Sequence, residues 1–247
     1  ANKKEKTFLI EGMSCASCSQ TVEKVTRAVA GVSDASVNLA TEKMFVSYDP
    51  TMIHPGDIER VVAEAGYKAI EESSTIEESD QNQAKKEQHI KNMWRRFWIS
   101  AVFTIPLLYL AMGHMLGLPL PMSLHPDMHP VTFALTQLVL TIPVMLLGTK
   151  FFTVGFKSLF KGHPNMDSLV ALGTSAAFLY SLYGTVAAIG GNNELVMNLY
   201  YESAAVILTL ITLGKYFEAV SKGKTSEAIK KLMGLAPKTA RVIRDGN

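Results

Sequence analysis

Cysteine is nearly absent from this sequence, whose 247 residues include only Cys15 and Cys18. A structural zinc site usually takes four Cys or His ligands, and neither a further cysteine nor a nearby histidine could complete one here. Residues 2–6 are Asn-Lys-Lys-Glu-Lys, which is not a secretory signal peptide, so a structural disulfide is not expected. The low cysteine content is typical of a reducing compartment.

The sequence also lacks an excess of charge of either sign. Its 24 Lys and Arg residues stand against 22 Asp and Glu residues, which gives a net charge of +2. Domains that bind nucleic acids carry a clustered basic excess, so we expect no nucleic-acid partner. Hydrophobic residues make up 48% of a chain whose first third is polar, so the apolar residues must be concentrated further along.

The two cysteines lie three positions apart within residues 12–18, between a short apolar run and a helical pattern that begins near Ser19. Thiolates are soft ligands that favour Cu(I) or zinc, and a site with only two sulfurs suits Cu(I) better. The start of the following helix favours the thiolate form. We therefore predict Cys15 and Cys18 as ligands of a Cu(I) ion, with Ag(I) as the alternative ion, and expect Met13 to pack beneath the loop.

The first 72 residues switch repeatedly between strand and helix periodicity. Strand patterns occur around residues 8–10, 35–39, 44–48 and 67–70, and helix patterns occur over residues 22–29 and 55–65. The order βαββαβ predicts an α+β, ferredoxin-like domain over residues 1–72. The competing interpretation of the two cysteines is a redox motif of the thioredoxin type, but a thioredoxin fold would run longer, with a longer helix after its motif.

A polar linker and a membrane region follow. Residues 73–92 are rich in charge and contain no Phe, Trp or Tyr, which predicts a flexible or marginally helical linker. Four apolar runs then occupy residues 97–113, 131–148, 169–189 and 199–213, near the ~20 residues that span a bilayer. We predict an α-helical transmembrane region over residues 93–232. Buried helices of a large soluble protein are the alternative, which four successive runs disfavour.

Lys and Arg alternate with the apolar runs. They precede the first run, follow the second and follow the fourth, whereas the loops at residues 114–130 and 190–198 contain none. Cytoplasmic loops carry the excess of Lys and Arg, so both chain ends are expected in the cytoplasm. The sequence therefore predicts a multi-pass protein of the plasma membrane, with the lipid bilayer as a partner.

Residues 150–162 predict an amphipathic helix that lies in the membrane interface and does not cross it. One face of this helix carries Lys150, Lys157 and Lys161. The opposite face carries the apolar residues Phe152, Phe156 and Leu159. Gly148 is expected to permit a bend before it. The helix is either a docking shelf for a soluble copper carrier or an interfacial anchor.

Residues 233–247 predict the start of a further, β-rich domain. Residues 239–244 have the pattern of a strand, and Asp245-Gly246 is a hairpin turn signal. The chain ends at Asn247 without a partner strand, so we expect the sequence to be cut within a domain.

Four segments carry a more specific signal, GMSCASC at 12–18, GHPNMDSLVALG at 162–173, YESAA at 201–205 and LGKYFE at 213–218. In combination they resemble the bacterial copper-exporting P-type ATPases, and the resemblance covers essentially the whole chain. It implies a heavy-metal-associated domain, two class-specific helices, the first two core helices and the start of an actuator domain. It also implies docking of a cytosolic copper chaperone, and ATP and Mg²⁺ as requirements of the full-length parent.

The resemblance assigns a transport path. Met166 and Glu218 belong to an entry site, and Glu202 belongs to the exit. The two glutamates are the only carboxylates in or bordering the fourth apolar run, where ionisable groups are costly and often functional. They lie 16 residues apart, a helical rise of about 24 Å that approaches the thickness of the hydrocarbon layer.

The sequence departs from the family pattern in two respects. Gly148 stands alone where the family often has two glycines, and the Thr-Gly-Glu, Cys-Pro-Cys and Asp-Lys-Thr-Gly-Thr motifs are missing. We therefore identify no catalytic or cofactor-binding residue, and expect these 247 residues not to hydrolyse ATP alone. The alternative to the front third of a pump is a non-catalytic, membrane-tethered copper-binding module or chaperone.

The distribution of positive charge makes the orientation testable. With Cys15 and Cys18 replaced by serine, a cysteine at Ser123 or Asn193 should react with a membrane-impermeant reagent outside the cell, because both loops lack Lys and Arg. A cysteine at Ser221 should react only after permeabilisation. The labelled fraction of each variant is the measurement, and the opposite pattern would reverse the assignment of entry and exit.

Overall fold

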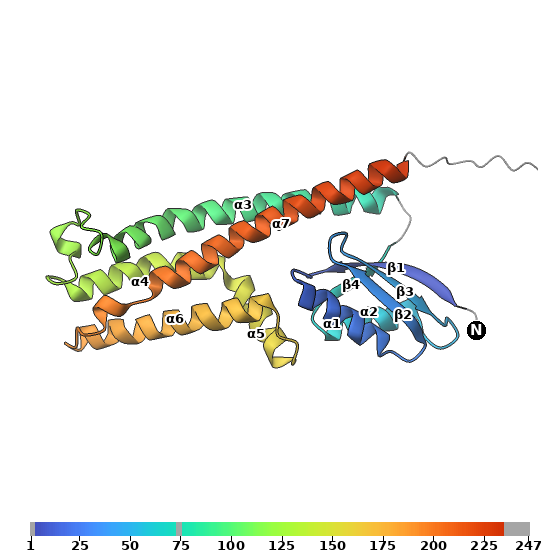
Figure 1. The fold of residues 1–247 in the computed structure, drawn as a ribbon, viewed down its shortest axis with the longest axis horizontal. Helices are drawn as coiled ribbons and strands as arrows, with labels where there is room; N and C mark the ends of the chain where they lie inside the picture. The colour runs from blue at the N-terminus through green and yellow to red at the C-terminus, as the bar shows by residue number, and fades with distance from the viewer. Residues whose placement is uncertain (1–2, 73–75, 235–247) are drawn as a thin grey trace, which may run out of the picture.

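The computed structural model describes residues 3–72 and 76–234. It consists of a small α/β part, here the N-terminal domain (residues 3–72), and long helices that form the helical region (residues 76–234) (Figure 1). The N-terminal domain contains, in chain order, β1 (Lys4–Glu11), α1 (Ala16–Arg27), β2 (Val32–Asn38), β3 (Lys43–Tyr48), α2 (Pro55–Glu64) and β4 (Lys68–Glu71). The predicted order of strands and helices is confirmed.

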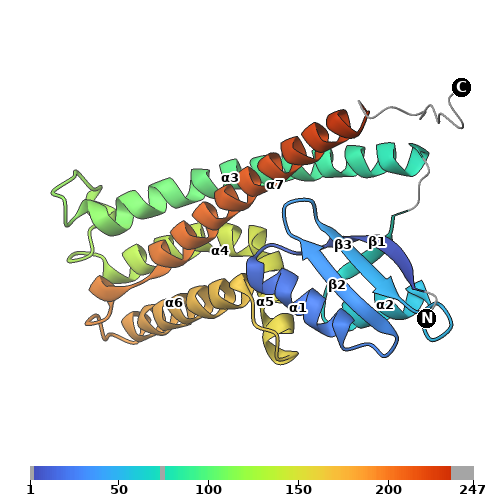
Figure 2. The ribbon, with the colours of Figure 1, turned by 45° about the vertical axis from the view of Figure 1, so that its right-hand side comes forward.

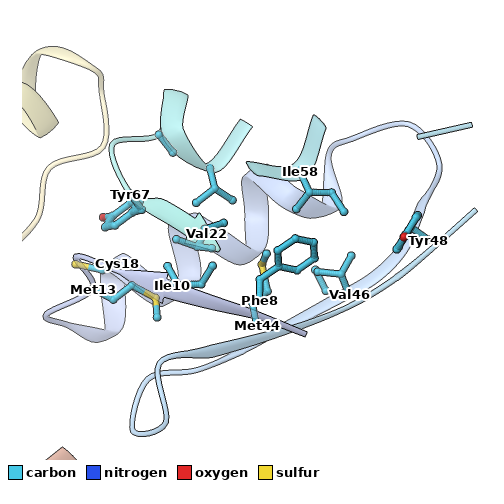
Figure 3. Close-up of a cluster of buried hydrophobic side chains, with 14 of the residues drawn as sticks. Phe8, Ile10, Met13, Cys18, Val22, Met44, Val46, Tyr48, Ile58 and Tyr67 are labelled. Atoms are coloured by element: carbon cyan, nitrogen blue, oxygen red, sulfur yellow. The ribbon is translucent and has the colours of Figure 1, made fainter. Parts of the chain in front are cut away.

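The four strands form one antiparallel sheet in the order β2-β3-β1-β4. Both helices lie on the same face of the sheet (Figure 3), which is the ferredoxin-like arrangement predicted from the sequence. Helix α1 begins at Ala16, earlier than the pattern near Ser19 suggested, because Cys15 already occupies the N-cap position. The helix therefore starts inside the cysteine loop.

The domain has a hydrophobic core of its own. Its fully buried members come from alternate positions of the strands and one face of each helix, and include Phe8, Ile10, Val22, Met44, Val46 and Ile58 (Figure 3). Burying each such side chain contributes roughly 1.5–3 kcal/mol. Among the residues that the structure describes, none of the helical region belongs to this core cluster, so the domain is a separate packing unit.

The helical region contains five α-helices and two short 3-10 turns. These are α3 (Ile76–Gly113), η1 (Met122–Leu124), α4 (Pro130–Leu147), α5 (Thr149–Phe160), α6 (Met166–Ile189), η2 (Val196–Asn198) and α7 (Tyr201–Gly234). Within the described residues, four helices are long and apolar enough to cross a membrane, at 86–113, 130–147, 166–189 and 196–224. The four predicted spans are confirmed in length and composition.

The segment predicted as a linker is largely helical. Residues 76–92 are the first part of α3 and continue into the first apolar run without a break, and residues 73–75 lie outside the described residues. A polar segment of good helix formers extends an existing helix at little cost, since nucleation is the unfavourable step. The extent of the linker, residues 73–92, stays a prediction.

Helix α5 leaves α4 at Gly148 and packs on α6. Gly148 has φ −84° and ψ 6°, a conformation that any residue can adopt, so its small size matters here and its backbone freedom does not. A Cβ atom there would lie 3.1 Å from Leu208 Cδ2. At Gly155 the approach is closer, because a Cβ atom would lie 2.3 Å from the carbonyl oxygen of Asp167. Small residues thus let α5 lie directly against the start of α6.

The final helix is longer than the fourth apolar run. Helix α7 continues unbroken through Gly214 to Gly234, which agrees with the charged helix expected to follow the last span. The predicted strand at residues 239–244 and the turn at Asp245-Gly246 lie outside the described residues.

Candidate metal centre

The cysteine loop brings the two sulfur atoms together at the start of α1. Gly12 has φ +97°, a left-handed conformation that favours glycine, and turns the chain after β1. The carbonyl oxygen of Cys15 accepts from the N–H groups of Cys18 and Ser19, at 3.0 and 3.3 Å. The Cys15 and Cys18 sulfur atoms are free thiols 2.7 Å apart. One soft metal ion could therefore bind both.

The two thiols are not equivalent. Burial opposes ionisation of Cys18, but hydrogen bonds from Cys15 Sγ, the Ser14 backbone and the Tyr67 hydroxyl outweigh it and lower the pKa of Cys18. Burial raises the pKa of Cys15, as does its hydrogen bond to Cys18. Cys18 is therefore the first thiolate, and a metal ion bound by both sulfurs displaces the proton of Cys15.

Met13 and Tyr67 complete the surroundings of the sulfurs (Figure 3). Met13 is 4% exposed and belongs to the domain core, which confirms that it packs beneath the loop. Tyr67 immediately precedes β4, and burial together with Cys18 raises the pKa of its hydroxyl. Tyr67 therefore stays protonated and donates to the sulfur.

The predicted entry residue Met166 lies next to this loop. It is the first residue of α6, and its backbone N–H lies beside the Cys15 thiol, where it partly opposes the rise in the pKa of Cys15. Asn165, the N-cap of α6, hydrogen-bonds with the Tyr67 hydroxyl. The structure thus brings the cysteine pair and Met166 together across more than 140 residues of sequence.

Glu218 belongs to the same end of the bundle. Its Oε1 atom lies 2.7 Å from Lys222 Nζ. One turn earlier on α7, Lys215 forms a shielded ion pair of 2.7 Å with Asp167, the neighbour of Met166. This pair fixes α6 against α7 and brings Met166 and Glu218 to the same level of the bundle. The ammonium group of Lys215 also lies 5.2 Å from the centre of the Phe151 ring.

Glu202 lies at the opposite end of α7. Its Oε1 atom accepts from Ser203, at 3.2 Å, and its buried Oε2 atom has no hydrogen-bond partner among the described residues. Sixteen steps of about 100° place it on nearly the opposite face from Glu218. Because α7 is unbroken at Gly214, a route between the two carboxylates would pass between helices.

Sequence reasoning missed Tyr67, Asn165 and Lys222 as neighbours of the site. Tyr67 was assigned only to a strand, and Asn165 lies inside the family segment 162–173 without an assigned role. Lys222 was counted only as a positive charge after the last span. No local signal identifies Lys222, because its contact with the Met13 carbonyl joins residues 209 positions apart.

The hydrogen bond from Tyr67 predicts the pH dependence of Cys18. In Tyr67→Phe the thiolate loses a donor, so the pKa of Cys18 should rise by about one unit, the equivalent of a charged hydrogen bond of about 1.4 kcal/mol. Alkylation of Cys18, followed against pH by peptide mass spectrometry, should shift its midpoint upward. Tyr48→Phe, a buried tyrosine of β3, is the control. An unchanged midpoint in Tyr67→Phe would contradict the assignment.

Comparison with known proteins places this geometry in context. Residues 7–68 match the family model of the heavy-metal-associated domain. The copper-exporting P-type ATPase of Bacillus subtilis (strain 168) is 40% identical over 245 residues, which cover 97% of this chain and 29% of that protein. Copper-transporting ATPase 1 of Rhizobium meliloti (strain 1021) is 43% identical over 251 residues, with 95% and 28% covered.

A solved structure, the N-terminal domain of a potential copper-translocating P-type ATPase from Bacillus subtilis in the Cu(I)-loaded state, is 36% identical. The match covers 30% of the present chain and 95% of the chain in that solved structure, with a TM-score of 0.28. The present chain spans less than a third of the length of the two curated relatives. It carries a heavy-metal-associated domain and, over nearly its whole length, matches the N-terminal part of bacterial copper-exporting P-type ATPases.

Proposed function

We propose that the chain is the copper-binding and copper-entry part of an ATP-driven Cu(I) exporter. The observation that carries this proposal is the convergence of two thiols, 2.7 Å apart, in a heavy-metal-associated domain that precedes four membrane-length helices. Two thiolates suit Cu(I) because it is soft and accepts low coordination numbers. Ag(I) has the same preference and is the second ion that the site would take.

The same proposal places the chain in the plasma membrane with both ends in the cytoplasm. The alternation of Lys and Arg between loops supports this orientation. The outward faces of the four helices carry exposed large apolar residues, such as Ile105, Leu169 and Leu179, as lipid contact requires. ATP and Mg²⁺ would act in the remainder of the full-length parent, so the 247 residues alone are expected to lack ATPase activity.

The transport path would begin at Met166 and Glu218 and end at Glu202. A thioether and a carboxylate bind Cu(I) more weakly than two thiolates do. Weaker binding suits a transport site, because the ion must leave it again. Glu202 offers a buried carboxylate oxygen with no described partner at the other end of α7. A cytosolic copper chaperone would dock on α5, whose Lys150 and Lys157 are exposed.

Copper titration tests the metal site. The full chain in nanodiscs should bind its tightest Cu(I) equivalent through both cysteines. Cys15→Ser or Cys18→Ser should weaken that binding more than about 100-fold, beyond the 10- to 100-fold loss typical of an outer-shell partner. Ser17→Ala, an exposed residue between the two cysteines, is the control. Unchanged affinity in the double serine variant would refute the site.

Transport kinetics test the path. In the full-length pump, Met166→Ala or Glu218→Ala should slow copper loading, because each removes an entry ligand. Glu202→Ala should leave loading intact and slow release. Copper loading and copper release are measured separately on inverted vesicles, with radioactive copper or by mass spectrometry. Glu194→Ala, an exposed carboxylate in the loop before α7, is the control. If Glu218→Ala loads copper at the wild-type rate, the entry role lies elsewhere.

A further inference from the structure

Helices α3 and α7 lie side by side in the helical region (Figure 2), and a row of four aromatic rings crosses their junction. The ring centres are 5.7 Å apart from Trp98 to Trp94, 4.7 Å from Trp94 to Tyr216 and 5.6 Å from Tyr216 to Phe217. Neither the metal centre nor the transport path uses this aromatic row (Trp94, Trp98, Tyr216 and Phe217).

The two ends of the aromatic row are open to the surroundings. Trp98 is 52% exposed and Phe217 is 57% exposed. Large rings with a polar edge, such as those of Trp and Tyr, are enriched where the hydrocarbon of a membrane meets the headgroups. The aromatic row therefore marks the level of one membrane surface on α3 and α7.

The exposed stripe of α3 changes character at this level. Toward the C-terminus of the helix it continues with Val102 and Ile105, which are 64% and 66% exposed. Toward the N-terminus it continues with Arg95 and Lys91, which are exposed and one helical turn apart. The stripe is thus apolar where it would meet acyl chains and basic where it would meet headgroups.

Helix α7 shows the same change on the side of Phe217. Ile207 and Leu210 precede the aromatic row and are 43% and 59% exposed, and Lys224 follows the row and is exposed. At Gly214, one turn before Phe217, an added Cβ atom would meet no atom within 4 Å. The surface beside the aromatic row is therefore open on both helices.

Arg95 and Lys91 have no acidic partner. In the part of the chain that the structure describes, neither residue forms an ion pair, whereas Lys215 and Lys222 of α7 each do. The next residue of the stripe, Glu87, precedes Lys91 by one turn and is not paired with it in that part. Like charges one turn apart on a helix destabilise it, so an anion between Arg95 and Lys91 would stabilise both.

We propose that Arg95 and Lys91 bind the phosphate group of an anionic phospholipid, whose acyl chains lie along the exposed stripe from Trp98 to Val102. The guanidinium group of Arg95 can donate two parallel hydrogen bonds to a phosphate, and Lys91 adds a positive charge one turn away. Phosphatidylglycerol carries the net negative charge that this pair lacks, whereas phosphatidylcholine carries none. This inference rests on the proposed placement of the helices in a membrane.

Such a lipid would add a contact between α3 and α7 near the membrane surface. Further along the same two helices, the buried hydroxyl groups of Thr104 and Thr209 lie 2.8 Å apart and join them. At the aromatic row the surface at Gly214 leaves room for an acyl chain. A lipid with its phosphate on α3 and a chain beside Gly214 would contact both helices.

Tryptophan fluorescence tests the site, because Trp94 and Trp98 are the two tryptophans of the chain. The full chain is reconstituted in phosphatidylcholine vesicles with an equal small fraction of dibrominated phosphatidylglycerol or dibrominated phosphatidylcholine, whose bromine atoms quench nearby tryptophans. We expect the phosphatidylglycerol to quench more strongly. The relative association constant should favour it about fivefold, equivalent to the ~1 kcal/mol that one basic group near a membrane surface contributes.

Three variants separate a site from a general effect of charge. Arg95→Gln combined with Lys91→Gln should abolish the preference, whereas Arg95→Lys keeps the charge and should keep most of it. Lys224→Gln is the matched control, because it removes one positive charge about 12 Å of helical rise beyond Tyr216 and should leave the preference unchanged. Quenching by dibrominated phosphatidylcholine, retained in each variant, shows that the helices are still inserted.

The outcomes distinguish the two proposals. If neither brominated lipid quenches the tryptophans of the unmodified chain, the proposed membrane placement fails. If both lipids quench equally, or if the double variant keeps the preference, the lipid site is overturned. An equal loss of preference in Lys224→Gln would show that only net charge matters, and would overturn the site as well.

Discussion

Two helix N-termini lie beside the same pair of sulfur atoms, and the ligand chemistry of this protein depends on that arrangement. The N-terminus of α1 begins inside the cysteine loop, with Cys15 at its N-cap position. The N-terminus of α6 lies beside the same loop, and its first N–H acts on Cys15 in the direction that lowers the pKa of the thiol. Free N–H groups and helix dipoles stabilise a thiolate more than they stabilise a thiol. The two sulfur atoms are therefore well suited to bind a soft cation. They also lie beside the helical region.

Several charged side chains at this end of the helices are partly buried, and they form ion pairs with one another. Asp167 is joined to Lys215, and Glu218 to Lys222, both at 2.7 Å. A buried charge without a partner is strongly destabilising, and at this end of the helices Asp167 and Glu218 each have an ammonium group beside them. Glu202 at the opposite end has no such group among the described contacts. The two ends of α7 thus differ in electrostatic character.

The sequence predicted the local structure well, because strands and helices follow from periodicity within a few residues. Alternation around Phe8 and Met44 produced β1 and β3, and the apolar face of Ile58 and Val62 produced α2. What a neighbour in space contributes was not visible in the sequence. The chain changes direction at Gly148 between α4 and α5, as expected, and only the structure shows that its missing side chain leaves room for Leu208. Residues 73–92 were predicted as a flexible or marginally helical linker, and the structure shows that α3 extends through residues 76–92.

The sequence by itself determined the ligand chemistry, since only two cysteines exist and their spacing places both sulfurs on one loop. It also determined the lengths of the spans and the family resemblance. Only the tertiary structure decided that Tyr67 donates to Cys18, that Met166 meets Cys15, and that Lys222 joins the Met13 carbonyl to Glu218. The physical reason is that a hydrogen bond or ion pair needs atoms within about 3–4 Å. No pattern of neighbouring residues reveals which distant groups the packing of domains and helices will bring that close.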